Sequence, residues 1–182
     1  MSDPKFFGYG SLVNLRTHTY ANPVPTTLNG WRRVWKPAGD RETSFLSIER
    51  VEGGQIDGMI AAVPKGDWGA LDAREAAYDR VDVSDQFRGT APVAIYQGRP
   101  EKNSTTHLNK PILLSYLDVV VQGFHDHFGV AGVERFFAST SGWDRPILND
   151  RVSPVYSRHQ TLTGTERTLV DKHLTQLSAV ME

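Results

Sequence analysis

The order of strand and helix signals along the chain is the feature that most constrains its fold. Short strand-like stretches separated by turn residues fill the first half of the sequence, and helical patterns fill the second half. This separation favours an α+β fold over alternating βαβ units. The length of 182 residues suits one compact domain. We therefore expect a single domain over residues 1–182, in which residues 1–98 form a core of strands with a short helix and residues 111–182 form a helical half that packs on it.

Six stretches of the first half are predicted to be strands. Apolar, aromatic or alternating side chains mark residues 5–9, 28–37, 44–50, 55–63, 78–84 and 91–97. Gly53 and Gly54 separate the third stretch from the fourth, which predicts a hairpin. So many short strands favour a small mixed β-barrel, closed or nearly closed, whose interior could hold a small ligand.

Four stretches are predicted to be helical. Asp67 is a suitable N-cap for a short helix over residues 67–77, and Pro111 opens a longer helix with apolar residues at helical spacing. Residues 130–139 are a further predicted helix, and a capping box at residues 163–166 opens a last helix over residues 163–180. The polar, turn-rich residues 98–110 are predicted to be a mobile loop.

Charge and composition exclude several classes of partner and chemistry. The net charge is −1, from 20 Lys and Arg against 21 Asp and Glu, so the chain has no field that would gather nucleic acid. It has no cysteine, which excludes disulfides, a thiolate nucleophile and thiolate zinc sites. No apolar run approaches the roughly 18 residues that cross a membrane, and the first residues do not fit a secretory signal. We therefore expect a cytoplasmic protein without a nucleic-acid or membrane partner.

The first predicted strand runs into a glycine-containing stretch, residues 6–12, with the sequence FFGYGSL. Without Cβ atoms at Gly8 and Gly10, backbone N–H groups can close around an anion or a developing oxyanion. The alternative is a tight turn in the core. The stretch is neither a phosphate-binding P-loop nor a dinucleotide fingerprint, because the residues that complete those motifs are missing.

The short helix predicted over residues 67–77 carries a carboxylate among apolar neighbours. Trp68, Leu71, Glu75 and Tyr78 share one face if that helix persists. A carboxyl desolvated there would have a raised pKa and could act as a general acid and base near neutral pH. The alternatives are a structural ion pair of Glu75 with one of three arginines, Arg74, Arg80 or Arg33, and a helix end too frayed for Glu75 to face inward.

Two further features of the second half have no assigned chemistry. His125 and His127 flank Asp126, but residues two apart on a helix point away from each other, so no metal site is expected. Residues 143–154 hold several arginines, aspartates and prolines, which favours an arginine-anchored loop that packs over the barrel.

Three blocks of sequence together resemble the γ-glutamylcyclotransferase-like superfamily. They are residues 7–12 (FGYGSL), residues 30–35 (GWRRVW) and residues 71–75 (LDARE) followed by Tyr78. The ChaC-like branch is the nearest, because Leu12 stands where the mammalian-type branch usually carries Asn. The resemblance implies one domain of this family: a small mixed barrel with flanking helices and a cavity for a γ-glutamyl group.

The resemblance also implies a reaction and a site. The substrate's α-amine would attack its own γ-carbonyl, which closes 5-oxoproline and expels an amine, amino acid or dipeptide, as in glutathione metabolism. Glu75 would be the catalytic acid and base, with no cofactor or metal, and the substrate-binding residues would be Tyr9, Gly10, Ser11, Leu12, Tyr78 and Tyr116. Two alternatives stay open: γ-glutamyl transfer or deprotection in secondary metabolism, and a non-catalytic module that binds a small ligand. The leaving group and the oligomeric state stay open as well.

Overall fold

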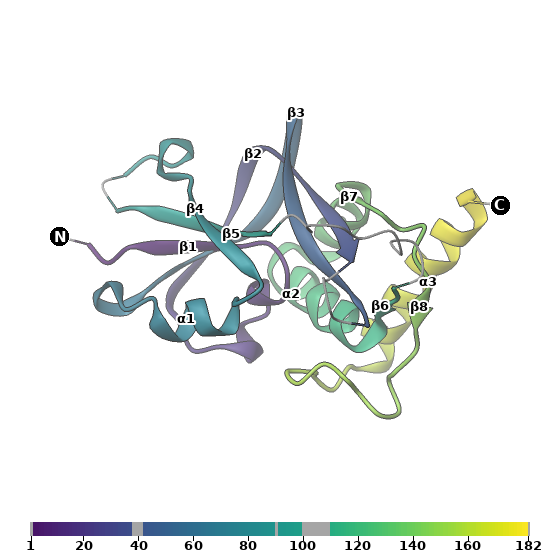
Figure 1. Cartoon of the computed structure of the whole chain (residues 1–182). Helices are drawn as coiled ribbons and strands as arrows, with labels where there is room; N and C mark the ends of the chain where they lie inside the picture. Colours follow the sequence, from purple (N-terminus) through teal and green to yellow (C-terminus); the bar gives the residue numbers. More distant parts are fainter. Residues whose placement is uncertain (1, 38–41, 90, 100–109, 182) are drawn as a thin grey trace.

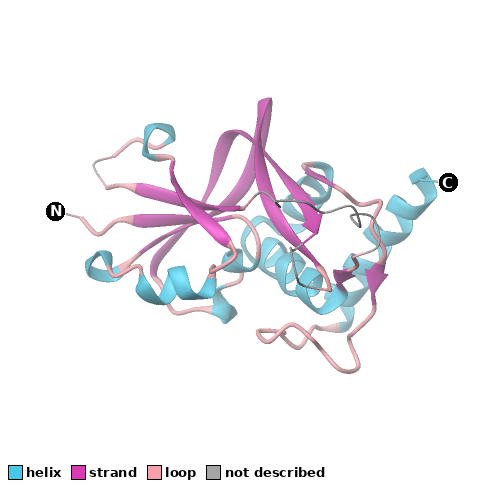
Figure 2. Cartoon of the chain, in the orientation of Figure 1, coloured by secondary structure: helices cyan, strands magenta, loops and turns pink. Residues whose placement is uncertain are grey.

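The computed structural model describes residues 2–37, 42–89, 91–99 and 110–181, so the predicted loop at 98–110 lies mostly outside the described residues. Figures 1 and 2 show its strands and helices: β1 (Lys5–Gly8), β2 (Ala21–Pro37), β3 (Ser44–Ala62), α1 (Gly69–Arg74), β4 (Tyr78–Asp82), β5 (Val93–Gly98), β6 (Ile112–Leu113), α2 (Leu114–Ala138), β7 (Thr140–Ser141), β8 (Ile147–Leu148) and α3 (Gly164–Met181). Four short 3-10 turns complete the order, of which η1 (Ser11–Val13) directly follows the first strand. Within these ranges no helix combines the length and apolar character that crossing a membrane requires.

Six strands form one mixed sheet in the order β4-β5-β1-β3-β2-β7. The strand β1 lies inside it, antiparallel to β3 and parallel to β5. The helices α2 and α3 lie together beside this sheet (Figure 1), so the α+β class is confirmed. The predicted barrel is not confirmed. Among the described residues the edge strands β4 and β7 do not pair with each other, so the sheet stays open.

The two longest strands, β2 and β3, pair with each other along almost their whole length. The predicted hairpin at Gly53 and Gly54 is therefore wrong, because both residues lie inside β3. Around these glycines the register shifts, so that residues 51–54 of β3 and Gly30 of β2 have no paired residue on the other strand. Gly30 and Gly53 have φ angles of 77° and 73°, in the left-handed region that favours glycine. The glycines thus form an irregularity within a continuous pair of strands instead of a chain reversal.

The helices begin and end close to their predicted positions, with one exception. Thr163 and Glu166 form the predicted capping box of α3, since the Thr163 N–H donates to Glu166 Oε2 (2.6 Å) and the Glu166 N–H donates to Thr163 Oγ1 (3.2 Å). The two predicted helices of residues 111–139 appear as α2, interrupted at Gly129 with φ 65°. The exception is α1, which ends at Arg74 and leaves Glu75 as its C-cap.

The apolar core lies on both faces of β1. Successive side chains of a strand point to opposite faces. Phe7 therefore packs into the larger core cluster, with Phe124 and other residues of α2, while Phe6 packs into a smaller cluster with Leu71 of α1. The end of β1 is thus held between α1 and α2, which are far apart in the sequence (Figure 1).

A fully buried arginine fixes the chain where β1 ends. The Arg33 guanidinium donates to the Tyr9 carbonyl (2.8 Å), to the Ser139 hydroxyl (2.9 Å) and to the Asp57 carbonyl. It also lies 4.7 Å from the centre of the Phe124 ring. Burial lowers the pKa of Arg33 to about 9, although the negative charge of Asp57 acts to raise it. At this pKa the guanidinium stays protonated at neutral pH. The main chain at Tyr9 is therefore tied to β2 and to the end of α2.

Candidate active site

A small cavity of about 30 Å³ opens where β1 ends. All seven residues predicted for the site line it: Tyr9, Gly10, Ser11, Leu12, Glu75, Tyr78 and Tyr116, together with Phe7, Gly8, Leu46 and Tyr96. They come from β1 and η1, from the end of α1, from β3, β4 and β5, and from α2. The structure therefore brings together residues that the sequence spreads over more than half of the chain.

The glycines at the end of β1 allow close contacts. A Cβ at Gly8 would lie 2.5 Å from the Cβ of Leu12, and a Cβ at Gly10 would lie 2.7 Å from the hydroxyl of Tyr116. Neither glycine has a positive φ, so the need is for space and not for an unusual backbone. The turn η1 that follows starts with N–H groups that have no acceptor inside the turn. The two expectations for this stretch are thus compatible, because the buried turn faces a cavity.

Glu75 takes part in an ion pair and also lines the cavity. Its Oε1 lies 3.2 Å from Nε of Arg74, and the two side chains are 15% and 8% exposed. Arg74 also donates to the Thr17 carbonyl (2.9 Å) and to the Ser11 hydroxyl (3.2 Å). The ion pair considered from the sequence is therefore formed with Arg74. The two other arginines contact other groups: Arg80 pairs with Asp72 on the surface, and Arg33 lies in the core.

The helix α1 does not persist to Tyr78, so the helical face expected on that condition is not formed, although Glu75 and Tyr78 still lie close together. Because α1 ends at Arg74, the chain leaves the helical path before Tyr78, which begins β4. The Tyr78 N–H donates to the Glu75 carbonyl (2.8 Å), so a tight turn and not a helix keeps the two residues close. The two side chains line the same cavity.

Two of the tyrosine hydroxyls in this cavity donate to main-chain carbonyls. Tyr9 donates to the Tyr96 carbonyl (2.6 Å), and Tyr78 donates to the Leu46 carbonyl (2.9 Å). Burial, followed by the neighbouring Tyr116 and by the charge of Glu75, raises the pKa of Tyr9 well above its ordinary value. The phenol of Tyr9 is therefore neutral at physiological pH.

The Tyr116 hydroxyl lies against the glycine turn. Burial is the main cause that raises its pKa, with additions from Tyr156 and from the charge of Glu75, while a main-chain hydrogen bond with Ser11 opposes the rise. The hydroxyl fills the space that a side chain at residue 10 would take. An aromatic wall thus surrounds one carboxylate, that of Glu75.

A second, larger cavity of about 380 Å³ adjoins the first. Ser11, Glu75, Tyr78 and Tyr116 line both cavities. The remaining wall of the larger one consists of Arg74, Leu113, residues 43–45 and residues 155–158. Residues 43–45 and 155–158 carry no motif that predicts a place in the site. The nearest prediction from the sequence was the arginine-anchored loop at residues 143–154, and it assigned that segment to packing and not to a binding site.

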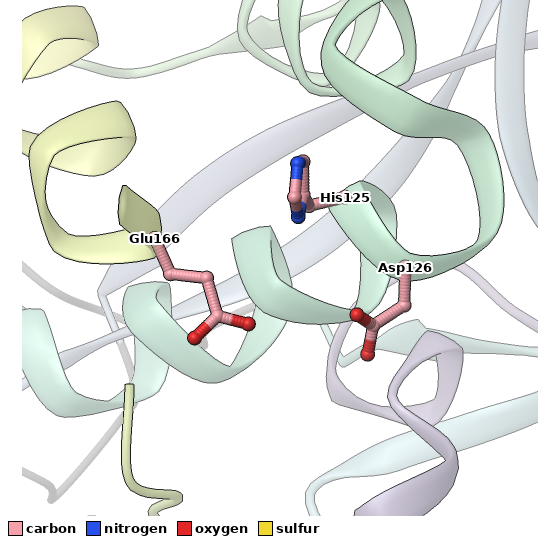
Figure 3. Close-up of side chains that lie close together, drawn as sticks. All are labelled: His125, Asp126 and Glu166. Atoms are coloured by element: carbon pink, nitrogen blue, oxygen red, sulfur yellow. The ribbon is translucent and has the colours of Figure 1, made fainter. Parts of the chain in front are cut away.

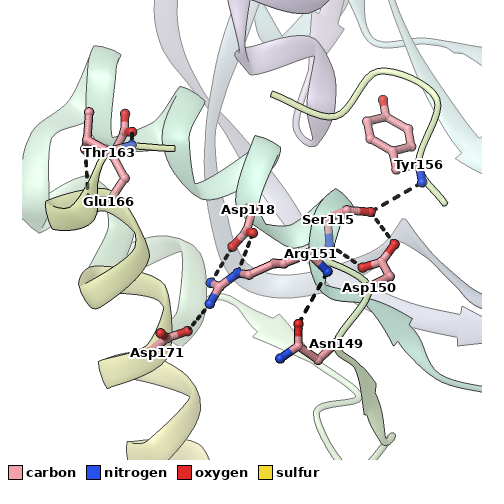
Figure 4. Close-up of polar contacts among 9 residues, drawn as sticks. All are labelled: Ser115, Asp118, Asn149, Asp150, Arg151, Tyr156, Thr163, Glu166 and Asp171. Atoms are coloured by element: carbon pink, nitrogen blue, oxygen red, sulfur yellow. Dashed lines mark hydrogen bonds and ion pairs between the residues drawn. The ribbon is translucent and has the colours of Figure 1, made fainter. Parts of the chain in front are cut away.

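Figure 4 shows how the segment leading to residues 155–158 is fixed. The Asp150 carboxylate accepts from the Ser115 N–H (2.8 Å), the Ser115 hydroxyl (2.5 Å) and the Val155 N–H (2.9 Å). The Tyr156 N–H donates in turn to the Ser115 hydroxyl (3.3 Å). Burial alone would raise the pKa of Asp150, but these hydrogen bonds outweigh it and leave the pKa below its ordinary value. A buried carboxylate therefore fastens this wall to the start of α2.

Arg151 fastens the same segment to both long helices. Its guanidinium pairs with both carboxylate oxygens of Asp118 on α2 (2.7 and 2.8 Å) and with Asp171 on α3 (2.7 Å), as Figure 4 shows. Such two-pronged pairs fix geometry as well as charge. The expected arginine-anchored loop is present, and its anchors lie on α2 and α3.

A cluster of possible metal ligands lies away from both cavities. His125, Asp126 and Glu166 offer ligand atoms within 4.8 Å of one another (Figure 3). Asp126 already forms an ion pair with Arg16, and Glu166 forms the capping box of α3. These contacts give the carboxylates a structural role, and we assign no metal to them.

Comparison with known proteins gives a likeness of fold. No protein-family model matches the sequence, and no match is found among curated proteins. Solved structures do match: a γ-glutamyl cyclotransferase (TM-score 0.56, 16% identity, 94% of this chain and 99% of that one) and YkqA from Bacillus subtilis (0.57, 17%, 78% and 57%). An uncharacterised human protein, loc79017, also matches (0.57, 13%, 94% and 99%). The chain therefore has the fold of the γ-glutamyl cyclotransferases.

Proposed function

We propose that the protein cyclises γ-glutamyl compounds, releasing 5-oxoproline together with an amine, amino acid or dipeptide. The observation that carries this proposal is the position of Glu75, a carboxylate beside the glycine turn of residues 8–12 in a wall of tyrosines. The likeness of fold to a γ-glutamyl cyclotransferase supports it. By the match at Leu12, we place the chain nearest the ChaC-like branch.

In this reaction the substrate's α-nitrogen forms a bond to its own γ-carbonyl carbon. The bond from that carbon to the leaving nitrogen then breaks, and the leaving nitrogen takes a proton. Glu75 accepts a proton from the substrate ammonium and returns it to the leaving nitrogen. The ring nitrogen then gives up its second proton, which departs with the released amine as its ammonium form, so one carboxylate suffices. Such proton transfer contributes about 10² to 10⁴-fold. The ring closure is intramolecular, so holding the glutamyl chain folded supplies much of the remaining acceleration.

The glycine turn binds the negative charge of the substrate. Backbone N–H groups of Gly10, Ser11 and Leu12 bind the α-carboxylate or the tetrahedral oxyanion. Loss of one donor of this kind typically costs about 10² to 10³-fold in rate. The rings of Tyr9, Tyr78 and Tyr116 enclose the glutamyl chain and exclude water.

Arg74 is a positioning residue in this mechanism. Its Nε lies 3.2 Å from Glu75 Oε1, and its other nitrogens bond to Thr17 and Ser11. The guanidinium thereby fixes the direction of the carboxylate relative to the glycine turn. The reaction uses no cofactor or metal, and we propose a cytoplasmic location with a small molecule as the partner.

The deciding experiment is a screen of γ-glutamyl compounds for release of 5-oxoproline. The panel includes glutathione, γ-glutamyl amino acids and γ-glutamyl amines, and both products are measured by mass spectrometry. Stoichiometric 5-oxoproline and free amine support cyclisation. Free glutamate or a γ-glutamyl group on an added acceptor would indicate deprotection or transfer instead. Binding without any product would indicate a non-catalytic module.

A further inference from the structure

Part of the larger cavity is shared with the small cavity, and Glu75 and Ser11 lie in this part, the near end. Residues 155–158 line the larger cavity alone and form its far end. In the proposed reaction the leaving nitrogen must lie beside Glu75, which returns a proton to it. The glutamyl chain then faces the glycine turn, and the leaving group extends toward residues 155–158.

The charges along the larger cavity are unequal at its two ends. Among its described lining residues the charged ones are Arg74, Glu75 and Arg158. Arg74 and Glu75 offset each other at 3.2 Å. No carboxylate in the described part of the chain pairs with Arg158, whereas Arg151 in the same segment has two such partners. Among the described residues, therefore, no carboxylate offsets the positive charge at the far end.

The wall that carries Arg158 is also well fixed. Asp150 and Ser115 hold the main chain at Val155 and Tyr156. The Tyr156 ring packs edge-on against Tyr116, with ring centres 5.0 Å apart. The main chain of this wall is therefore already ordered before a ligand binds, so binding loses less conformational entropy there, which favours specific recognition.

We infer that the larger cavity is the leaving-group site and that Arg158 makes it selective for leaving groups that carry a carboxylate. This inference rests on the proposed function and narrows its substrate class. A guanidinium that pairs with no carboxylate of the described residues suits a substrate carboxylate, which it can bind through two hydrogen bonds, and it disfavours a cationic polyamine. Amino acids and short peptides are thus the leaving groups that fit. The volume of about 380 Å³ is ample for them.

The test compares two substrates that differ in that carboxylate alone. Alanine is the leaving group of γ-glutamylalanine, and ethylamine, which lacks the carboxylate, is that of γ-glutamylethylamine. We expect the protein to prefer γ-glutamylalanine in kcat/KM by about tenfold or more, the usual worth of a charge-assisted hydrogen bond. Arg158→Gln should remove this preference mainly by raising KM for γ-glutamylalanine, with little change for γ-glutamylethylamine. Arg88→Gln is the matched control, since Arg88 is also exposed but lines neither cavity, and it should leave the preference intact.

The outcomes separate this inference from the proposed function. Release of 5-oxoproline at equal rates from both substrates, or an unchanged preference in Arg158→Gln, would overturn the inference and leave the function standing. If neither compound is turned over, calorimetry with both ligands decides. Tighter binding of γ-glutamylalanine that is lost in Arg158→Gln would support the inference while the function fails. Equal binding, or none, would overturn the inference as well.

Discussion

The two adjoining cavities differ in how the chain builds them. The small cavity is lined chiefly by residues of two short stretches, 7–12 and 75–78, whose motifs can be recognised in the sequence. The larger one adds residues 43–45 and 155–158, which carry no recognisable motif and meet through tertiary packing alone. The part of the site proposed to carry out the reaction is thus built by residues close together in the sequence. The part proposed to select the leaving group is built by contacts between residues far apart in the sequence. Substitutions at the two ends should therefore have different signatures.

The largest expected effect is at Glu75, in the part shared by both cavities. Glu75→Gln keeps the size of the side chain but removes its exchangeable proton. Turnover should fall by at least about a hundredfold with substrate binding largely retained, the pattern of an interaction made in the transition state. Steady-state kinetics measure turnover and substrate binding, and a thermal melt shows whether the variant stays folded.

The control for this change is Glu52→Gln on the exposed side of β3, which should alter neither property. A Glu75→Gln protein that unfolds, while its folded fraction keeps its specific activity, would make the pair with Arg74 purely structural and end the proposed mechanism.

A smaller effect is expected at Gly10, in the small cavity alone. In Gly10→Val the new Cβ would lie 2.7 Å from the Tyr116 hydroxyl and 3.4 Å from the Leu46 side chain. The added side chain would also occupy the approach of the glutamyl carboxylate. We expect KM to rise by about tenfold or more, comparable to the loss of one charge-assisted hydrogen bond, with a smaller change in melting temperature. Gly164→Val is the matched control, because a Cβ at Gly164 meets no atom within 4 Å. Unchanged KM and kcat in folded Gly10→Val would exclude the glycine turn from substrate binding.

At the larger cavity, Asp150→Asn should act through stability. Asparagine cannot accept from all three donors that Asp150 holds, so one buried group loses its partner, at a cost of about 1 to 3 kcal/mol. The pKa of Asp150 is lowered in the folded state, so its charge stabilises the protein above the unfolded pKa of about 3.9 and loses that effect as the pH falls further. Urea unfolding should therefore show a larger difference from wild type at neutral pH than at about pH 3. Asp144→Asn, at an exposed residue of the same stretch, should be neutral at both values. An equal loss at both pH values would contradict the charged role of Asp150.

The smallest effect is expected from a chelator. Glu75 is the one carboxylate among the described lining residues of both cavities, and these residues include no histidine, so they offer too few ligands for a divalent ion. EDTA should leave the activity unchanged. Loss of activity that a divalent ion restores would overturn this prediction and direct attention to His125 and Glu166.

The predictions that succeeded from sequence rest on local signals. The capping box at Thr163, the strand that ends in the glycine turn and the break before residue 130 each depend on a few neighbouring residues. Gly53 and Gly54 misled because a glycine pair has the same local signature in a turn and in a bulge, and the long partner strand β2 decides between them. The extent of α1 was overestimated because the turn after Arg74 is closed by a bond from Tyr78, which helical periodicity does not anticipate. The wall at residues 155–158 depends on a buried carboxylate in another segment, so no local pattern could have revealed it.

The open sheet has a consequence for how the protein avoids sticking to itself. A sheet that does not close leaves two strands with free backbone groups, which are templates for pairing with other chains. Here one edge, β7, is two residues long. The other edge, β4, carries three exposed charged side chains, Asp79, Arg80 and Asp82, among its five residues. A short edge and a charged edge are two of the devices by which natural sheets resist aggregation. The strand that begins at the tyrosine of the proposed site thus also protects the molecule from its own copies.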